Sequence, residues 1–422
     1  MDIYHYTKNL LLVTVYTCSL LTITFLAGAQ SKIDFKGRIL DRETNKPLSF
    51  VSIGIPRSGT GVVTNEFGEF IYHVPQNFEY DKIQISLLGY KKVQINVADI
   101  KSGELTLIKL EPEIQMLNEI TVKVIPAVDI VSKAIRNIRK NYPNNTALFY
   151  SYYRDYLKEI GSDDYINLLE AAVIIEDRGF NNEDYEQSKI KLEQIRYNSG
   201  FVTDSLLNPG YDGKIKRVPY TKMKASNELA LLRFQDPIRN HSRGVFSWVY
   251  VFDYDFIPGH NFDYESIIAD DTSKIFVINF DKYISRSSDS TTREYWVEGK
   301  IYIRSNNYAI LKFNYTVTCK LPGYTGKFYD LKLEYKNLEG KYYLNYLSMC
   351  NYFEYKHDAK SNPQQYYQYR ELFINKIVNS HFKSLKYREI INIRSSLMKN
   401  QVPVQKGFWE SYNYPSNLKL IE

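Results

Sequence analysis

The segment Thr64-Asn65-Glu66-Phe67-Gly68-Glu69-Phe70, residues 64–70, decides how the N-terminal region folds. Asn65 and Gly68 stand at the first and fourth positions of a type I turn, where each residue type is preferred. Short runs in which apolar and polar residues alternate flank this turn, as in strands with one buried face. The segment therefore predicts a tight hairpin between two short strands.

Similar short runs continue on both sides of the turn, from residue 33 to residue 111. Polar loops separate them, among them the loop from Asp41 to Pro47. About seven strands fit into this range, and so many short strands bury their apolar faces economically only as a small antiparallel sandwich. The residues predicted to share its core are Ile39, Val51, Ile53, Phe70, Ile85 and Leu87.

Three ordered blocks of this region carry a resemblance to a known family. They read Phe35-x-Gly37-x-Ile39-x-Asp41-x-x-Thr44-x-x-Pro47-Leu48-x-x-Val51, Gly61-x-x-Thr64-Asn65-x-x-Gly68-x-Phe70 and Ser86-Leu87-Leu88-Gly89-Tyr90. This pattern is similar to the carboxypeptidase-D-type regulatory-like domain. The resemblance implies a transthyretin-like or immunoglobulin-like β-sandwich that is attached to other domains in exported proteins of the Bacteroidota type. In that family the domain has no catalytic residues of its own, so the resemblance does not imply a peptidase.

The first 29 residues are predicted to be a secretory signal peptide. A polar start with Lys8 precedes an apolar run from Leu10 to Leu26, and the small residues Ala27-Gly28-Ala29 follow, as at a cleavage site. A retained transmembrane anchor is the alternative, but the run contains five Ser or Thr residues and no basic cluster follows it. The mature chain is therefore expected to begin near Gln30, in the periplasm or at the outer membrane.

The composition is that of a globular, strand-rich protein. Apolar residues make up 44% of the chain and charged residues 24%, which argues against long disorder, and the length favours two or three domains. The 38 Tyr residues favour strands, because aromatic side chains suit a half-buried pleated surface. The net charge of +6 is spread along the chain, so we expect no nucleic-acid partner.

Residues 112–148 are predicted to link the sandwich to the next domain through a strand and one amphipathic helix. The strand, at residues 117–124, resembles the stretch that follows the sandwich in outer-membrane receptors coupled to a TonB-type partner, but we interpret it as a plain interdomain strand. The helix begins at Pro126, which suits the first helical position, and ends after Tyr142, before Pro143. Its basic stripe suits peripheral association with an anionic membrane or, as we prefer, exposure to solvent with the apolar side docked on its own domain.

Residues 149–422 are predicted to form a large, curved antiparallel sheet, which makes the protein mainly β. Alternation along residues 309–318 gives this sheet a buried face and a wet face. Residues 179–198 and 208–226 are expected to be irregular. The strand-turn-strand pattern of residues 296–310 resembles that of lipoprotein-carrier half-barrels. The six best-defined strands form a meander at residues 275–280, 292–303, 308–319, 328–335, 342–355 and 366–377.

No known catalytic or cofactor motif occurs in the sequence. A zinc carboxypeptidase needs a closely spaced His and Glu with a distant third ligand, and none of the five histidines of the mature chain has a suitably placed Glu. The Gly-x-Ser-x-Gly elbow of serine hydrolases and the phosphate-binding loops are missing as well. We therefore predict no catalytic, cofactor-binding or metal-binding residues, and a protein that is not an enzyme.

One cluster of polar residues suggests an alternative. Asp253, Asp255, His260, Asp263 and Glu265 lie close together within an aromatic segment. Carboxylates around an imidazole suit a calcium ion or a transition metal, or an acid–base pair. We prefer to interpret the segment as a half-exposed strand, with its rings inward and its carboxylates in water.

The sequence as a whole predicts an exported binding or scaffolding protein whose partner is an unknown ligand or envelope protein. An enzyme of unfamiliar design, based on Asp253, Asp255, His260 and Asp263, is one alternative. A protein coupled to a TonB-type receptor system is another. We disfavour an integral outer-membrane barrel, because charged residues occur on every strand and no aromatic girdle is evident.

Cys319 and Cys350 are predicted to be free thiols, since two cysteines cannot form a disulfide framework. We expect both on one face of the meander, separated by the strand at residues 328–335, with Cα atoms about 9–10 Å apart, which is too far for a disulfide. Thiol alkylation under denaturing, nonreducing conditions should therefore add two labels, as measured by mass. An intramolecular bridge would mean that the proposed strand order is wrong.

Overall fold

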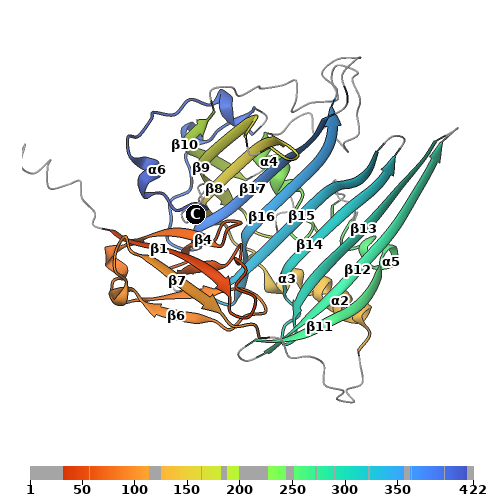
Figure 1. Cartoon of the computed structure of the whole chain (residues 1–422), viewed down its shortest axis with the longest axis horizontal. Coiled ribbons are helices and arrows are strands. Elements are labelled where there is room, and N and C mark those ends of the chain that lie inside the picture. Colours follow the sequence, from red (N-terminus) through yellow and green to blue (C-terminus); the bar gives the residue numbers. More distant parts are fainter. Residues whose placement is uncertain are drawn as a thin grey trace, which may run out of the picture.

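The structure is a computed structural model in which two β-rich bodies pack against each other (Figure 1). It is mainly β, as the sequence predicts. No helix in the described part of the chain is long and apolar enough to cross a membrane. The predicted signal peptide and the strand predicted at residues 117–124 lie outside the described residues. The structure describes residues 32–56, 58–113, 125–162, 164–181, 188–198, 227–243, 251–270, 273–288, 291–321, 324–355, 362, 364–393 and 395–415.

The N-terminal body is a sandwich of two small sheets, as predicted, but it is not antiparallel throughout, because β1 pairs with β7 in parallel. Its elements are β1 (Lys32–Asp41), β2 (Ser52–Ile55), β3 (Thr60–Val63), β4 (Glu69–Pro75), η1 (Gln76–Phe78), β5 (Lys82–Ser86), β6 (Val93–Asn96), η2 (Val97–Asp99) and β7 (Leu105–Leu110). One sheet has the strand order β4-β1-β7 and the other the order β3-β2-β5-β6. The predicted core residues are buried together in one cluster, except Leu87, which packs against its edge.

The turn at residues 64–70 forms as predicted, but it does not close a hairpin. β3 and β4 belong to different sheets, so the turn carries the chain from one layer of the sandwich to the other. The side-chain Oδ1 of Asn65 accepts hydrogen bonds from two backbone N–H groups of the turn, both at 2.9 Å. Gly68 has a φ of 75°, and a Cβ there would meet the carbonyl oxygen of Ile39 at 2.4 Å. The alternation of apolar and polar residues could not distinguish a hairpin within one sheet from a crossover between two sheets, because both bury the same flanking residues.

The second body is a ten-stranded antiparallel sheet. Its strands are β8 (Ala147–Glu159), β9 (Asn167–Asp177), β10 (Lys189–Tyr197), β11 (Asn261–Asp270), β12 (Ser273–Ser288), β13 (Thr291–Arg304), β14 (Ile310–Leu321), β15 (Tyr324–Leu338), β16 (Lys341–Tyr355) and β17 (Gln364–Val378). They are arranged in the order β10-β9-β8-β17-β16-β15-β14-β13-β12-β11, which confirms the predicted six-strand meander as β12 to β17. The expectation of an irregular stretch at residues 179–198 is wrong for β10, where a register shift between Leu192 and Gln194 interrupts the alternation that marks a strand.

Helices cover one face of this sheet, the helix face, which carries Phe313, Leu331, Leu333 and Leu347. The helices are α2 (Ala127–Arg136), α3 (Ile138–Asn141), α4 (Glu228–Phe234) and α5 (Phe256–Gly259). The single helix predicted from Pro126 starts one residue later, at Ala127, and is divided at Asn137. Its apolar side docks on the sheet as preferred. Arg136 and Lys140 remain exposed. Tyr142, which follows α3, fixes the end of the helical segment by donating a hydrogen bond to the carbonyl oxygen of Ile310 at 2.7 Å.

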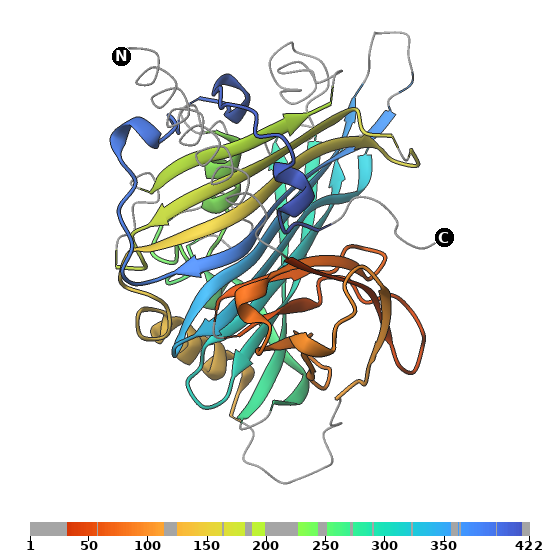
Figure 2. The same ribbon diagram turned by 90° about the vertical axis from the view of Figure 1, so that its left-hand side faces the viewer.

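The sandwich docks on part of the opposite face, which we call the sandwich face. The large sheet is therefore a middle layer, with helices on one side and the sandwich on the other (Figure 2). The ring of Phe50 lies 4.9 Å from the ring of Tyr346, and Val63 packs against Tyr346 and Phe373. A second apolar contact joins Leu88 of the sandwich to Ile268, Ile275 and Val277 of β11 and β12.

The C-terminal segment ties the two bodies together. It contains η4 (Tyr387–Glu389), η5 (Leu397–Lys399) and α6 (Phe408–Ser411). The N–H of Ile391 donates to the carbonyl oxygen of Ile190 at 2.8 Å, which covers part of the edge strand β10. Further on, the side chain of Asn413 exchanges hydrogen bonds of 2.8 and 3.2 Å with the backbone of His73 in the sandwich.

A β-bulge at Asn345 determines which residues of β16 face the sandwich. Glu334 pairs with Tyr346 and Tyr335 pairs with Leu344, so Asn345 is an extra residue without a partner in the ladder. The alternation of β16 is reversed beyond this point. Tyr346 therefore lies on the sandwich face, although an unbroken strand would place it on the same face as Leu344.

The same bulge explains why one expectation about the cysteines is wrong. Both thiols are buried and free, but they do not share a face. Cys319 belongs to the apolar cluster of the helix face, and so does Met349. Because neighbours along a strand point to opposite faces, Cys350 faces the sandwich side. The sheet itself separates the two thiols.

Phe70→Ala should destabilise the protein by about 3–5 kcal/mol, because the Phe70 ring is completely buried and packs edge-on against Phe35 at 4.9 Å. Urea unfolding of the full chain, followed by circular dichroism and tyrosine fluorescence, measures this loss. Tyr80→Ala is the control, since Tyr80 is 93% exposed and its loss should change little. Equal midpoints for the two variants would contradict the assignment of Phe70 to the core.

Candidate functional site

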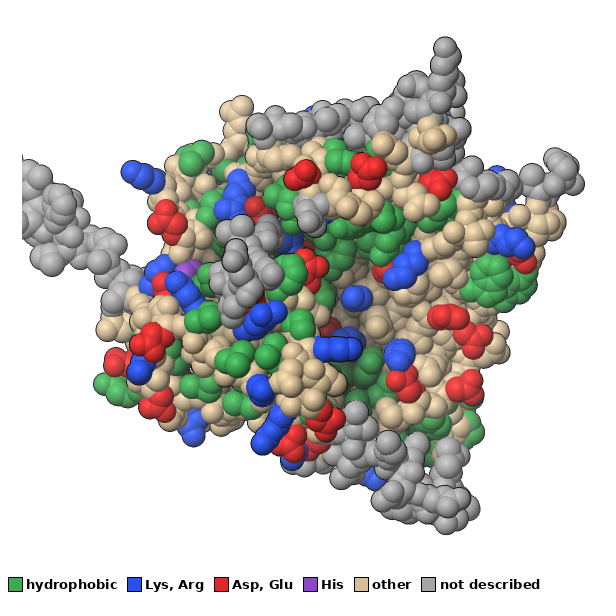
Figure 3. All heavy atoms as spheres, viewed as in Figure 1, with side chains coloured by type: hydrophobic (Ala, Val, Ile, Leu, Met, Phe, Trp, Pro, Cys, Tyr) green, Lys and Arg blue, Asp and Glu red, His purple; other side chains and the backbone are tan. Residues whose placement is uncertain are grey.

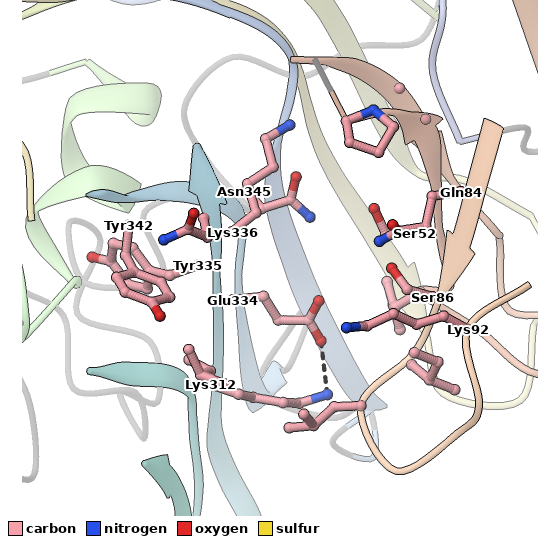
Figure 4. Close-up of a pocket in the computed structure, with 18 of the residues that line it drawn as sticks. Ser52, Gln84, Ser86, Lys92, Lys312, Glu334, Tyr335, Lys336, Tyr342 and Asn345 are labelled. Atoms are coloured by element: carbon pink, nitrogen blue, oxygen red, sulfur yellow. Dashed lines mark hydrogen bonds and ion pairs between the residues drawn. The ribbon is translucent and has the colours of Figure 1, made fainter. Parts of the chain in front are cut away.

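A cavity of about 310 Å³ lies where the sandwich meets the large sheet; we call it the interface cavity (Figure 4). Both bodies contribute to its lining, and both contribute polar side chains. Figure 3 shows the hollow between the two bodies, with basic side chains around it. A volume of this size is at the lower end of the range for small-molecule sites, about 300–1,000 Å³.

The sandwich side of the cavity is built by strands β2 and β5. Ser52 pairs with Ser86 and Gly54 pairs with Gln84, so the side chains of Ser52, Gln84 and Ser86 are neighbours on one face of the small sheet (Figure 4). Position 54 has no room for a larger residue, because a Cβ at Gly54 would meet the backbone oxygen of Thr60 at 2.4 Å. The loop that follows β5 adds Leu87, Leu88 and Lys92.

Strands β11 to β17 all contribute to the sheet side of the cavity, and β14 and β15 supply three of its charged groups, Lys312, Glu334 and Lys336. Lys312 and Glu334 are cross-strand partners, and their side chains form an ion pair of 2.7 Å. Burial alone would lower the pKa of Lys312, but the Glu334 carboxylate overcomes this effect and raises that pKa. Lys312 is therefore a charged group that already has its counterion.

Lys336 is different, because no carboxylate among the described residues pairs with it. Its ammonium approaches the carbonyl oxygen of Gly59, in the loop between β2 and β3, at 3.4 Å. Burial lowers the pKa of Lys336 from 10.5 to about 8, since the charged form loses its hydration without gaining a counterion. At neutral pH the group still carries its positive charge, in a setting that disfavours it.

The rest of the lining is mostly apolar. Leu88 packs against the cluster of Ile268 and Ile275, and Leu311 joins the same cluster from β14. Four basic side chains, Lys92, Arg304, Lys312 and Lys336, stand against two acidic ones, Glu113 and Glu334, in the lining. The cavity thus combines an apolar wall with a surplus of positive charge. Such an arrangement can bind a ligand.

Beyond the interface cavity, the sandwich face continues as an open polar groove of about 580 Å³ across β11 to β15. Its charged groups are largely satisfied by neighbours. Asp330 accepts hydrogen bonds from Thr316 at 2.6 Å and Tyr352 at 2.8 Å, and Lys300 pairs with Glu265 at 2.6 Å. In the part of the chain that the structure describes, no three or more His, Cys, Asp or Glu residues are placed to hold a metal ion.

The cluster at residues 253–265 does not assemble into a site. His260 is buried in a nest of aromatic rings on the helix side, 4.7 Å from Phe256 and 5.5 Å from Phe280, and burial lowers its pKa to about 4. Asp263 is exposed on the opposite face of β11, where it borders the polar groove. The imidazole and this carboxylate therefore lie on opposite sides of the sheet.

The preferred interpretation of this segment as one half-exposed strand is also only partly correct. Asp253 and Asp255 lie in a turn before the short helix α5, and β11 starts at Asn261. Asp255 is exposed and accepts a hydrogen bond from the N–H of Val251 at 3.3 Å. Since the five residues do not converge, the enzyme alternative loses the feature on which it was based.

Sequence reasoning did not find the interface cavity. Charged residues at 312, 334 and 336 alternate with apolar neighbours, as on any wet face of a sheet, and this pattern carries no sign of burial. The one available signal is indirect. A predicted accessory sandwich must dock somewhere, but alternation does not say on which face.

Residues 35–122 match the family model described as CarboxypepD_reg-like domain. The match begins within β1, includes β2 to β7 and extends beyond the residues that the structure describes. The N-terminal body is therefore a carboxypeptidase regulatory-like domain, as the sequence blocks indicate. The large sheet lies outside the match.

No curated protein matches the sequence. Among solved structures, a DUF1329 family protein from Desulfovibrio piger is 8% identical, with 60% of this chain and 94% of that chain covered and a TM-score of 0.21. Lipovitellin is 12% identical over 58% of this chain and 26% of its own, with a TM-score of 0.22. A putative membrane-associated protein of unknown function from Bacteroides fragilis is 11% identical over 82% and 98%, with a TM-score of 0.15. At scores this low, none of the three establishes a shared fold.

Lys336→Met should stabilise the protein by about 1–3 kcal/mol at pH 7, because it removes a partly buried charge that has no counterion among the described residues and keeps the apolar stem. The folded pKa of about 8 lies below the unfolded value of 10.5, so the unfolded chain binds more protons between these values. The wild type therefore gains stability as the pH rises through this window, and the advantage of the variant should shrink.

Melting temperatures at pH 7.0 and pH 9.5 test this prediction. Lys82→Met is the matched control, since Lys82 is an exposed strand residue of the sandwich, and it should change the melting temperature little at either pH. A Lys336→Met variant that is less stable than the wild type at pH 7 would show that the charge is compensated.

Proposed function

We propose that this chain is an exported, non-enzymatic binding protein of the cell envelope that holds a small ligand in the interface cavity. The carboxypeptidase regulatory-like domain is then an accessory module that closes the cavity from one side. Export is supported by the apolar run and the small-residue motif of the first 29 residues. The absence of a known catalytic motif supports a binding role.

The observation that carries the proposal is that two separate bodies contribute to one cavity. Ser52, Gln84 and Ser86 face Lys312 and Glu334 across it (Figure 4). A contact that served only to hold the bodies together would be expected to close to normal packing density, as the neighbouring contact of Phe50 with Tyr346 does. Sites between domains that combine an apolar wall with a few polar groups are typical places for small ligands.

The proposal predicts that filling the cavity abolishes binding. N-phenyl-1-naphthylamine, a neutral apolar fluorophore, should bind the purified mature chain with a saturable rise in fluorescence. Gln84→Trp should weaken this binding at least tenfold, because the indole occupies the space between the bodies.

Gln94→Trp is the matched control. Gln94 pairs with Gln84 on the neighbouring strand β6 but is exposed and does not line the cavity. Circular dichroism and the melting temperature should confirm that both variants fold. The proposal fails if the wild type gives no saturable signal, or if both Trp variants bind the probe as the wild type does.

A further inference from the structure

The charge pattern of the interface cavity indicates which chemical class of ligand it takes. This inference rests on the proposed function, because it assigns the ligand of the same cavity. Lys312 is neutralised by Glu334 at 2.7 Å, whereas Lys336 has a carbonyl oxygen at 3.4 Å and no carboxylate partner among the described residues. The two lysines lie on adjacent strands and face the same cavity. The cavity therefore holds one lysine with a carboxylate partner and one without such a partner among the described residues.

Lys336 is partly buried, and an isolated ammonium in such a position is costly, because it loses hydration that no counterion replaces. An apolar side chain of similar length would fill the same space at no such cost. A bound anion would remove the penalty by completing the ion pair. The cavity is therefore better matched to a ligand with a negative charge than to a neutral or cationic one.

The apolar part of the lining restricts the ligand further. Leu88, Ile268, Ile275 and Leu311 form a continuous wall beside the basic groups. Inorganic anions would leave this wall in contact with water, whereas an alkyl chain would cover it at a gain of about 25 cal/mol per Å². The volume of about 310 Å³ suits one short chain and not a two-chain lipid.

We propose that the interface cavity binds a small single-chain amphiphilic anion, with the headgroup at Lys336 and the alkyl chain along the wall formed by Leu88, Ile268, Ile275 and Leu311. A carboxylate and a phosphate monoester share this chemistry. Ser52, Ser86 and Gln84 are in place to donate hydrogen bonds to the remaining headgroup oxygens.

Displacement of bound N-phenyl-1-naphthylamine from the wild-type chain tests the ligand class. The competitors are decanoate, decyl phosphate, decanol and decyltrimethylammonium, all below the concentrations at which they form micelles. Both anions should displace the probe at concentrations at least tenfold lower than decanol does, and the cation should be weakest. Acetate and inorganic phosphate, which lack the chain, should not displace it. Comparison of decanoate with decyl phosphate identifies the preferred headgroup.

The role of Lys336 is tested with a set of matched variants. Lys336→Met should keep probe binding but lose the preference for anions over decanol, and Lys336→Arg should retain it. Lys82→Met, which removes an exposed lysine of the sandwich, should behave as the wild type.

The results separate the two proposals. If the wild type binds the probe and Gln84→Trp does not, but decanol competes as well as decanoate, the proposed function stands and the anionic ligand is wrong. The assignment of Lys336 is overturned if Lys336→Met keeps the full preference. If the probe does not bind the wild type at all, the proposed function itself fails.

Discussion

The β-bulge at Asn345 is the constraint on which the arrangement of the two bodies depends. One extra residue in β16 turns Tyr346 away from the helix face, and Tyr346 with Phe373 then forms the apolar surface on which Phe50 and Val63 pack. Burial of one such side chain contributes about 1.5–3 kcal/mol, whereas an exposed ion pair contributes about 0–1 kcal/mol. The aromatic contact, and not the charged residues around it, therefore decides where the sandwich docks. Phe50 adopts a left-handed φ of 60° in this contact, a conformation that costs about 1–3 kcal/mol and is maintained by the packing around it.

Docking of the sandwich changes the environment of the charged residues on the sandwich face. On an open sheet, Lys312, Glu334 and Lys336 would be ordinary hydrated side chains. The docked sandwich separates them in part from water, so a missing counterion becomes costly. The register of β14 and β15 decides which lysine has a counterion. Lys312 lies directly opposite Glu334 and keeps its counterion. Lys336 pairs across the ladder with Tyr343 and receives none from that strand. The charged face of the sheet thus lines an electropositive cavity once the sandwich covers it.

The fold was predictable from sequence wherever one strand follows the next with regular alternation, as in β12 to β17 and in the core around Ile39 and Phe70. Prediction failed where the period of two is interrupted. The bulge at Asn345 put Cys350 on the other face, and the register shift in β10 hid a strand. The turn at Asn65 was recognised from its chemistry, but its role as a crossover depends on long-range pairing that local pattern does not contain. The cavity was not predictable for the same reason, since its two halves, at residues 50–113 and 268–373, meet only through docking.

A ligand that contacts both bodies also stabilises their association. Contacts made to both the sandwich and the sheet exist only when the two are docked, so binding and docking must stabilise each other by the same free energy. The docked state is already maintained by the contact of Phe50, which lines the cavity, with Tyr346, and by the hydrogen bonds between Asn413 and His73. These contacts hold the walls of the cavity in position before a ligand arrives. Because the walls are already in position, little binding free energy is lost in ordering the protein. A cavity of modest volume can therefore bind a small ligand with useful affinity.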